Sequence, residues 1–438
     1  MPRNYPPAQK RLRLGLLIFV HVVVCCVSLI YVAGYSFPRG FSPSSFHVFF
    51  DQARWYVAVA VVAGFALVSL LFVFAEFSFG YFVGFYFYTM IVGYLWINCF
   101  SDLNYDHRWA GLSAAASAVA FLFPALCITS PVRQIYSLTP ASFDRLLSSI
   151  LVLGIATIMI GSIYNFRFVA LAEIYNYREK FDNPALLNYL VSIVSGVMLP
   201  FAFAAFVARQ ARWRAAAVLV LLLFFYPITL TKISLFTPVW LVVMLALSRT
   251  FDARMTVILT LLAPILGGLA LIIPFGSYGA LYFSVVNFRM VAVPSIAMDV
   301  YNDFFSRHDL TYFCQISVLK RIMHCPYQEQ LSIVMKNAYE LGAFNASLFS
   351  TEGIASVGPV FAPASALVCG LVVAFANRLS SGLPPGFILI SSSVLPQILL
   401  NVPLSTTLLT HGAAVLFLLW YITPRTIFEP KQTGYSIP

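Results

Sequence analysis

The sequence is dominated by apolar runs that are each long enough to cross a membrane. Runs of roughly 17–25 residues recur along the chain, and this length matches the roughly 30 Å hydrocarbon core of a bilayer. Only 10% of the residues are charged and 61% are hydrophobic, whereas soluble domains carry about 25% charged residues. The period-2 alternation of a membrane β-barrel is absent. The sequence therefore predicts an all-α, polytopic membrane helix bundle.

The apolar runs predict about twelve transmembrane helices. Their expected positions are residues 14–35, 55–74, 77–99, 110–129, 146–164, 187–208, 215–231, 233–248, 255–275, 353–376, 386–401 and 404–423. The two runs around Lys232 form a stretch of 34 residues, from Ala215 to Ser248, with no other charge. One helix of that length would be about 51 Å long, and Pro227 and Pro238 disfavour a straight helix. The sequence therefore predicts a tight hairpin with Lys232 at its turn.

The distribution of basic residues predicts the orientation. The net charge of +10 more often marks the cytoplasmic side of a membrane protein than nucleic-acid binding, so no nucleic-acid partner is expected. Arg3, Lys10, Arg11 and Arg13 precede the first span, which places the N-terminus in the cytoplasm. Twelve spans return the C-terminus to the same side. The first run lacks a small-residue cleavage site and is long enough to span, so we expect it to be retained.

The longest polar segment, residues 276–352, is expected on the opposite, periplasmic side. It separates an N-terminal bundle of about nine spans, residues 1–275, from C-terminal spans and a cytoplasmic tail, residues 353–438. Loops this long are usually functional or disordered. Aromatic residues and helix formers favour a folded loop with amphipathic helices. Its most apolar part, residues 287–309, is expected to lie along the membrane surface or to re-enter the bundle.

The outer face gathers residues that suggest its chemistry. Five cations could hold the phosphate of a lipid head group there: Lys232, Arg289, Arg307, Lys320 and Arg321. The candidate bases are Glu352, Asp299, Asp303 and His324. For Lys232 and Arg289 the alternative is a side chain that only extends its charge to the membrane surface. Cys314 and Cys325 can form a disulfide in an oxidising compartment, with two unlinked thiols as the alternative.

Several chemistries have no motif in this sequence. It contains no P-loop, no GxSxG motif and no His/Cys cluster with metal-ligand spacing. We therefore expect no metal or other cofactor. The cations and candidate bases instead predict an enzyme that acts on a lipid-linked substrate from outside the membrane, where a nucleotide donor would be scarce.

Four segments in the second half of the chain resemble oligosaccharide repeat-unit polymerases of the O-antigen polymerase type. They are TKISLF (231–236), FRM…P…YNDFF (288–305), FNASLFSTEGIASVGPV (344–360) and NVPLSTTLLTHG (401–412). Many members of that family contain an Asn-Ala-Asn segment, then an acidic residue, then Asn-x-Gly. This chain has Asn345-Ala346-Ser347, Glu352 and Val357-Gly358 at those places, so it departs from the family at Ser347 and before Gly358.

The resemblance implies a GT-C-like membrane glycosyltransferase in the bacterial inner membrane. Such enzymes join repeat units carried on undecaprenyl pyrophosphate at the periplasmic face, without a metal, to build lipopolysaccharide or another surface polysaccharide. A chain-length regulator would be a further partner. The resemblance implies that Arg289 and Lys232 stabilise the leaving pyrophosphate and that Glu352, His324 or Asp303 is the base. The remaining expected substrate-binding residues are Tyr301, Asn345, Arg307, Arg321 and His411.

Three other functions share some of these features. An O-antigen ligase, or another glycosyltransferase with a lipid-linked donor, would need the same cations and outer loop but a different acceptor. A polysaccharide or lipid transporter would be expected to show matched broken helices in two similar halves, and no such similarity is found. A structural partner in a polysaccharide assembly complex would tolerate loss of Arg289.

Overall fold

The computed structural model describes residues 6–34, 49–170, 173, 177, 183–316, 319–340, 349–399 and 401–428, without the side chains of Arg321 and Phe349. Throughout these ranges the regular structure is helical. Ten helices in the described ranges are long and apolar enough to cross a membrane. The chain is therefore a polytopic helical protein, in agreement with the predicted class.

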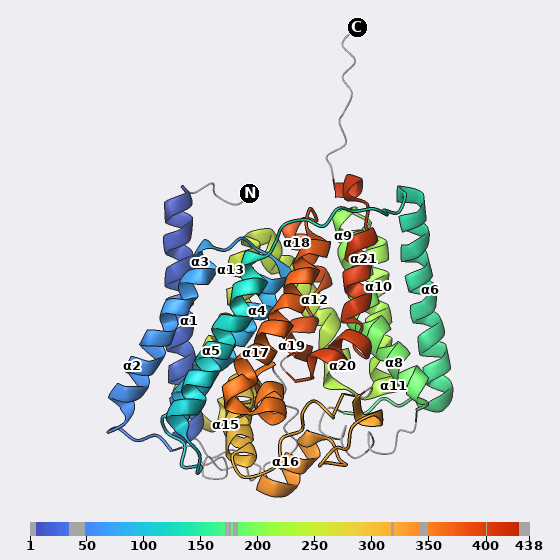
Figure 1. Cartoon of the computed structure of the whole chain (residues 1–438). Coiled ribbons are helices and arrows are strands. Elements are labelled where there is room, and N and C mark those ends of the chain that lie inside the picture. The colour runs from blue at the N-terminus through green and yellow to red at the C-terminus, as the bar shows by residue number, and fades with distance from the viewer. Residues whose placement is uncertain are drawn as a thin grey trace. The chain divides into compact units, whose positions relative to one another are not determined.

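The helices form two compact units, which are described separately (Figure 1). Unit 1 consists of residues 1–129, 250–375 and 396–406, and unit 2 of residues 130–249, 376–395 and 407–438. The main helices of unit 1 are α1 (Pro7–Gly34), α2 (Trp55–Ala66), α3 (Leu70–Phe74), α4 (Phe79–Asn98), α5 (His107–Cys127), α13 (Ala253–Phe275), α14 (Ala280–Phe283), α15 (Val293–Phe305), α16 (Leu331–Tyr339) and most of α17 (Phe349–Ser380). Those of unit 2 are α6 (Pro140–Tyr164), α8 (Ala185–Ile193), α9 (Leu199–Ala208), α10 (Arg212–Phe224), α11 (Tyr226–Thr229), α12 (Lys232–Thr250), α18 (Pro385–Ser391) and α21 (Ala413–Ile422).

Helix α4 is the centre of unit 1. It is apolar on all sides, every residue from Phe79 to Ile97 is buried, and α1, α2, α5, α13 and α15 pack around it. A helix that is apolar all round is expected to be buried in this way. Two hydrogen bonds fix its neighbours: the Tyr86 hydroxyl donates to Thr260 Oγ1 at 3.0 Å, and His21 Nε2 lies 2.8 Å from Thr89 Oγ1.

The predicted loop of residues 276–352 begins as part of the bundle. Helix α13 ends at Gly276 with φ +51°, and a side chain at Gly279 would lie 2.6 Å from the backbone of Leu271. Farther on, Asn287 Nδ2 donates to the Ile265 carbonyl at 2.8 Å. The chain therefore folds back along α13 instead of leaving it. It continues through η4 (Gly276–Gly279), α14 and the π-helix η5 (Ser284–Ala292) to the end of α15.

Helix α15 shows which alternative for this segment is correct. All residues from Pro294 to Phe305 are buried, so the segment re-enters the bundle and does not lie on its surface. The first part of the predicted polar loop is consequently bundle helix. The physical reason is that its apolar residues pack in unit 1 and its polar residues find partners there.

The break before Lys232 confirms the predicted division into two helices. Leu230 has a left-handed backbone with φ +44°, which ends α11, and α12 begins at Lys232. Hydroxyl groups hold the turn, because Thr231 Oγ1 lies 2.7 Å from Ser234 Oγ and Thr229 Oγ1 lies 3.1 Å from Ser234 Oγ.

The last two predicted spans are not single long helices. Residues 386–401 form two short helices, α18 and α19 (Leu395–Leu399), and residues 404–423 form α20 (Leu404–Leu409) and α21. None of these reaches the length of a span. Three successive serines at residues 391–393 interrupt the first run, and Gly412, with φ +78°, interrupts the second. The described chain therefore has ten long apolar helices instead of the expected twelve.

Candidate functional site

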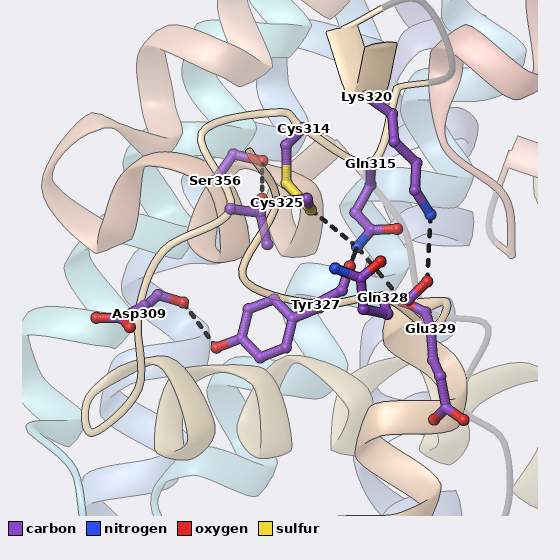
Figure 2. Close-up of a disulfide and its surroundings, with 10 residues drawn as sticks. Asp309, Cys314, Gln315, Lys320, Cys325, Tyr327, Gln328, Glu329 and Ser356 are labelled. Atoms are coloured by element: carbon purple, nitrogen blue, oxygen red, sulfur yellow. Dashed lines mark hydrogen bonds between the residues drawn. A yellow bond between two sulfur atoms is a disulfide. The ribbon is translucent and has the colours of Figure 1, made fainter. Parts of the chain in front are cut away.

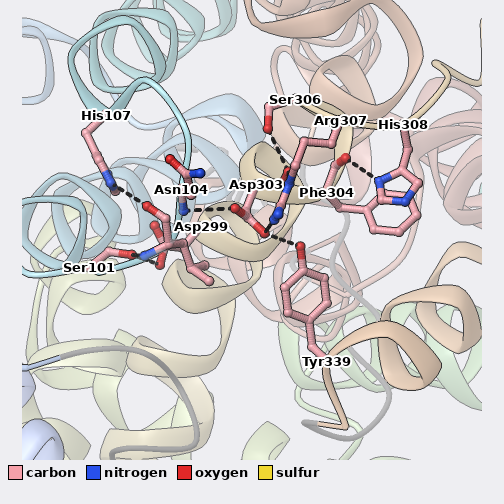
Figure 3. Close-up of polar contacts among 11 residues, drawn as sticks. Ser101, Asn104, His107, Asp299, Asp303, Phe304, Ser306, Arg307, His308 and Tyr339 are labelled. Carbon is pink, nitrogen blue, oxygen red and sulfur yellow. Dashed lines mark hydrogen bonds and ion pairs between the residues drawn. The ribbon is translucent and has the colours of Figure 1, made fainter.

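Two carboxylates lie inside unit 1 on one face of α15. Asp299 and Asp303 are four residues apart, so the helix places them on the same side, and both are fully buried. The link between α4 and α5, residues 101–106, faces them (Figure 3). Ser101 Oγ donates to Asp299 Oδ2 at 2.6 Å, and the Tyr105 hydroxyl donates to Asp299 Oδ1.

A second layer of polar groups positions Tyr105. Its hydroxyl also lies 2.8 Å from Asn98 Oδ1, and His107 Nδ1 lies 2.9 Å from the same oxygen. Burial raises the pKa of the Tyr105 hydroxyl far above its usual range, and the neighbouring Tyr94 and Asp299 raise it further. Tyr105 therefore stays protonated and acts as a hydrogen-bond donor to the buried carboxylate.

Asp303 joins three parts of unit 1. Its carboxylate accepts a hydrogen bond from the Asn104 backbone amide at 3.0 Å, pairs with Arg307, and accepts from the Tyr339 hydroxyl on α16 (Figure 3). The Asp303 side chain has no exposed surface, whereas 53% of the Arg307 side chain is exposed. Burial, and then the bond to Asp303, raise the pKa of Tyr339. This carboxylate is therefore fully surrounded by donors.

A disulfide joins Cys314 and Cys325, the two cysteines that the sequence placed in the outer loop (Figure 2). Their Cα atoms are 5.4 Å apart, within the usual range for a disulfide. The Thr311 amide donates to the Ala355 carbonyl on α17 at 2.8 Å, and the Tyr327 hydroxyl donates to the Asp309 carbonyl at 2.8 Å. The cross-linked segment is therefore held against the start of α17.

Glu352 lies at that start of α17, next to α15. The residue is half-buried, and its carboxylate accepts a hydrogen bond from the Leu404 amide. The chain that follows α15 is bonded to the same helix, because the Tyr312 amide donates to the Ser356 carbonyl at 3.0 Å and Thr311 Oγ1 lies 3.0 Å from Ser356 Oγ.

The remaining predicted residues are more scattered. Arg289 is exposed on η5, and His324 is exposed in the disulfide segment. In the described part of the chain, no hydrogen bond or ion pair joins Arg289 or His324 to Glu352 or Asp303. Lys320 donates to the Gln328 carbonyl (Figure 2). Asn345 and the side chain of Arg321 lie outside the described residues.

Two predicted residues belong to unit 2. Lys232 is exposed at the first position of α12. His411 is half-buried in the turn before α21, and burial lowers the pKa of its imidazole. The structure thus brings Asp303 together with Arg307 and places Tyr301 and Glu352 in the same unit, but describes Lys232 and His411 in a different unit.

The link between α4 and α5 contributes to the site but contains none of the predicted site residues. Ser101, Asn104 and Tyr105 supply the partners of both aspartates, although the first half of the chain contained no motif that we could use. The available signal was the local density of polar groups, because six of the seven residues in SDLNYDH (101–107) are polar or aromatic and the segment follows one apolar helix and leads into the next. Asp299 and Tyr339 belong to the same cluster.

Among the described residues, no group of three or more His, Cys, Asp or Glu side chains is arranged to hold a metal ion. Compared with known proteins, the chain matches no family model, no curated protein and no solved structure.

Proposed function

We propose that the protein is a membrane glycosyltransferase that polymerises oligosaccharide repeat units from a polyprenyl-pyrophosphate-linked donor. The observation that carries this proposal is the pair of hydrogen bonds that joins residues 311 and 312 to α17 inside unit 1: the Thr311 amide donates to the Ala355 carbonyl at 2.8 Å, and the Tyr312 amide donates to the Ser356 carbonyl at 3.0 Å. Thr311 and Tyr312 follow one segment that resembles O-antigen polymerases, residues 288–305, and Ala355 and Ser356 lie in another, residues 344–360. A shared site built from both segments requires such a connection.

The geometry favours Glu352 over the two aspartates as the base. Asp299 accepts bonds from two hydroxyls, and Asp303 from an amide, a guanidinium and a hydroxyl. Their oxygens are therefore already occupied. Glu352 is half-buried, and a base must be within reach of the proton that it accepts. In this proposal Asp299 and Asp303 hold the surrounding structure together.

The proposed reaction transfers the growing chain to the incoming unit. A sugar hydroxyl of the incoming unit attacks the anomeric carbon of the growing chain, and Glu352 accepts the hydroxyl proton. The bond from that carbon to the pyrophosphate oxygen breaks, and the lipid pyrophosphate leaves with the bonding electrons. Arg289, exposed on η5, is the cation that we assign to this developing negative charge.

The disulfide supports the proposed location. Disulfides persist in oxidising compartments such as the periplasm and are rare in the cytosol. The Cys314–Cys325 bond therefore favours a periplasmic position for the segment between α15 and α17. We propose that the protein works in a bacterial inner membrane, with the site at its periplasmic face and undecaprenyl-pyrophosphate oligosaccharide as substrate.

The test is a glycan gel from cells that lack this protein and carry either the wild-type gene or a variant. We expect wild type to restore a ladder of polymer lengths and Glu352→Gln to leave single repeat units. The expected loss is roughly 100-fold or more, the usual contribution of a general base. Glu340→Gln is the matched control, because Glu340 is an exposed glutamate at the end of α16.

The outcomes separate the alternatives. A normal ladder with Glu352→Gln, at equal protein level, would rule out Glu352 as the base. If cells without the protein accumulate full-length polymer on the lipid carrier and none on the surface, the protein is a ligase and the polymerase proposal fails. Arg289→Gln should also leave single units, and a normal ladder in that variant would remove Arg289 from the site.

A further inference from the structure

A groove opens between α6 and α10 of unit 2, and none of the residues of the proposed glycosyltransferase site lines it. It has a volume of about 810 Å³ and is lined by Asp144, Arg145, Ser148, Ser149, Val152, Leu153, Ala156 and Arg214. Small-molecule sites usually have about 300–1,000 Å³, so the space suits a ligand larger than an ion.

The lining changes from charged to apolar along α6. The charged and hydroxyl side chains lie in residues 144–149, and the apolar side chains in residues 152–156. From Arg145 to Ala156 the helix rises roughly 16 Å at 1.5 Å per residue. Half of the roughly 30 Å hydrocarbon core is about 15 Å. The groove therefore has the polarity and length of one leaflet of a bilayer, with a polar end and an apolar end.

The charged end is cationic after internal pairing. Asp144 is the one carboxylate in the lining and pairs with Arg209 through both of its oxygens. In the described part of the chain, no ion pair involves Arg145 or Arg214. The Arg214 guanidinium lies over the Phe206 ring at 5.9 Å. Two arginines, one from each helix, thus line the groove beside a single carboxylate, which is already paired with Arg209.

Helix α6 packs closely against α10 and α11 next to this groove. A side chain at Gly154 of α6 would lie 3.8 Å from Leu221 of α10, and one at Gly161 would lie 2.8 Å from Ile228 of α11. The groove is therefore bounded by packed helices, and its shape belongs to unit 2 alone.

We propose that this groove binds an anionic glycerophospholipid. The phosphate would lie between Arg145 and Arg214 and accept hydrogen bonds from their guanidinium groups, while the Ser149 hydroxyl donates to a glycerol oxygen. The Ser148 hydroxyl donates to the Asp144 carbonyl at 3.0 Å. One acyl chain would lie along Val152, Leu153 and Ala156. Basic pockets between membrane helices are a known type of site for acidic lipid head groups. A zwitterionic lipid places its own cation beside the arginines and fits less well.

The test measures lipid retained by the full-length protein in detergent, by native mass spectrometry. The probe is dioleoyl phosphatidylglycerol, with dioleoyl phosphatidylcholine and inorganic phosphate as competitors. We expect phosphatidylglycerol to be retained and neither competitor to displace it at equal concentration. The double variant Arg145→Gln/Arg214→Gln should weaken retention about thirtyfold, the effect of two arginines at a lipid surface.

A charge-matched control separates a site from general attraction. Arg133→Gln/Arg249→Gln removes two exposed arginines of unit 2 that do not line the groove, and retention should change less than about twofold. Ala156→Phe keeps every charge but fills the apolar end, and it should also reduce retention. Equal loss in the control variant, equal retention of phosphatidylcholine, or displacement by inorganic phosphate would each overturn the proposal.

Discussion

The charged side chains of two regions differ in burial and pairing: Asp299 and Asp303 with their partners in unit 1, here called the α15 cluster, and the α6–α10 groove of unit 2. In the cluster, Asp299 and Asp303 have no exposed surface, and donors from the same unit surround each of them. In the groove, Arg145 and Arg214 are exposed and form no ion pair among the described residues. A buried charge must be matched within the protein, whereas an open one can be matched by a ligand. The cluster should therefore dominate stability, and the groove should dominate binding.

The largest loss of stability is expected when a carboxylate is removed from the α15 cluster. Asp299→Ala removes the hydrogen bonds from the Ser101 and Tyr105 hydroxyls to this carboxylate, and it leaves Tyr105 its bond to Asn98 Oδ1. Hydrogen bonds to charged groups contribute about 1.5–3 kcal/mol each, so we expect a loss of about 3–6 kcal/mol in unfolding free energy. The measurement is thermal unfolding of purified protein in detergent.

The control for that variant is Asp309→Ala, because the Asp309 side chain is exposed and its backbone carbonyl makes the bond to Tyr327. We expect the midpoint of Asp309→Ala to stay close to that of wild type. Asp299→Asn, which keeps one acceptor oxygen, should lie between the two. A wild-type midpoint for Asp299→Ala would mean that the cluster does not support the fold.

A second, smaller effect should follow from opening the disulfide. Cys314→Ser/Cys325→Ser removes a cross-link between cysteines 11 residues apart, which should cost about 2–3 kcal/mol. The segment between α15 and α16 should become the first site of limited proteolysis. Cys127→Ser, which changes an exposed free cysteine, should leave the cleavage pattern unchanged. Equal cleavage of all three proteins would show that hydrogen bonds alone hold the segment.

Sequence patterns predicted the parts of the fold that depend on local composition. The length of the apolar runs gave the first ten long helices, and the run length and prolines around Lys232 gave the break at Leu230. The same reasoning failed where the outcome depends on distant partners. The return of the chain after Gly276 is stabilised by hydrogen bonds from Asn287 to Ile265 and Ser28. These partners are too far from Asn287 in the sequence for a short stretch of residues to indicate the bonds.

The candidate site divides in the same way. Asp303, Arg307 and Glu352 could be selected because their residue types suit the chemistry of a phosphate-linked sugar. Their partners could not, since Ser101 and Asn104 lie 198 and 199 residues from the aspartates that they bind. An i, i+4 pair of aspartates predicts a shared helix face, but the sequence does not say what that face contacts.

The smallest change in stability is expected from the Asp144–Arg209 ion pair beside the groove, which tests whether exposure alone explains the difference between the two regions. Asp144 and Arg209 resemble Asp303 and Arg307 chemically, but their side chains are 41% and 30% exposed. Ion pairs near the surface contribute about 0–1 kcal/mol, so Asp144→Asn should lower the unfolding free energy by less than about 1 kcal/mol. The variant also releases Arg209 beside the groove, so retention of phosphatidylglycerol should rise. If Asp144→Asn destabilised the protein as much as Asp299→Ala, exposure would not distinguish the two regions. If retention of phosphatidylglycerol fell instead, the Asp144–Arg209 ion pair would be needed to keep the shape of the groove. Lipid binding would then depend on an ion pair within the protein as well as on the two arginines.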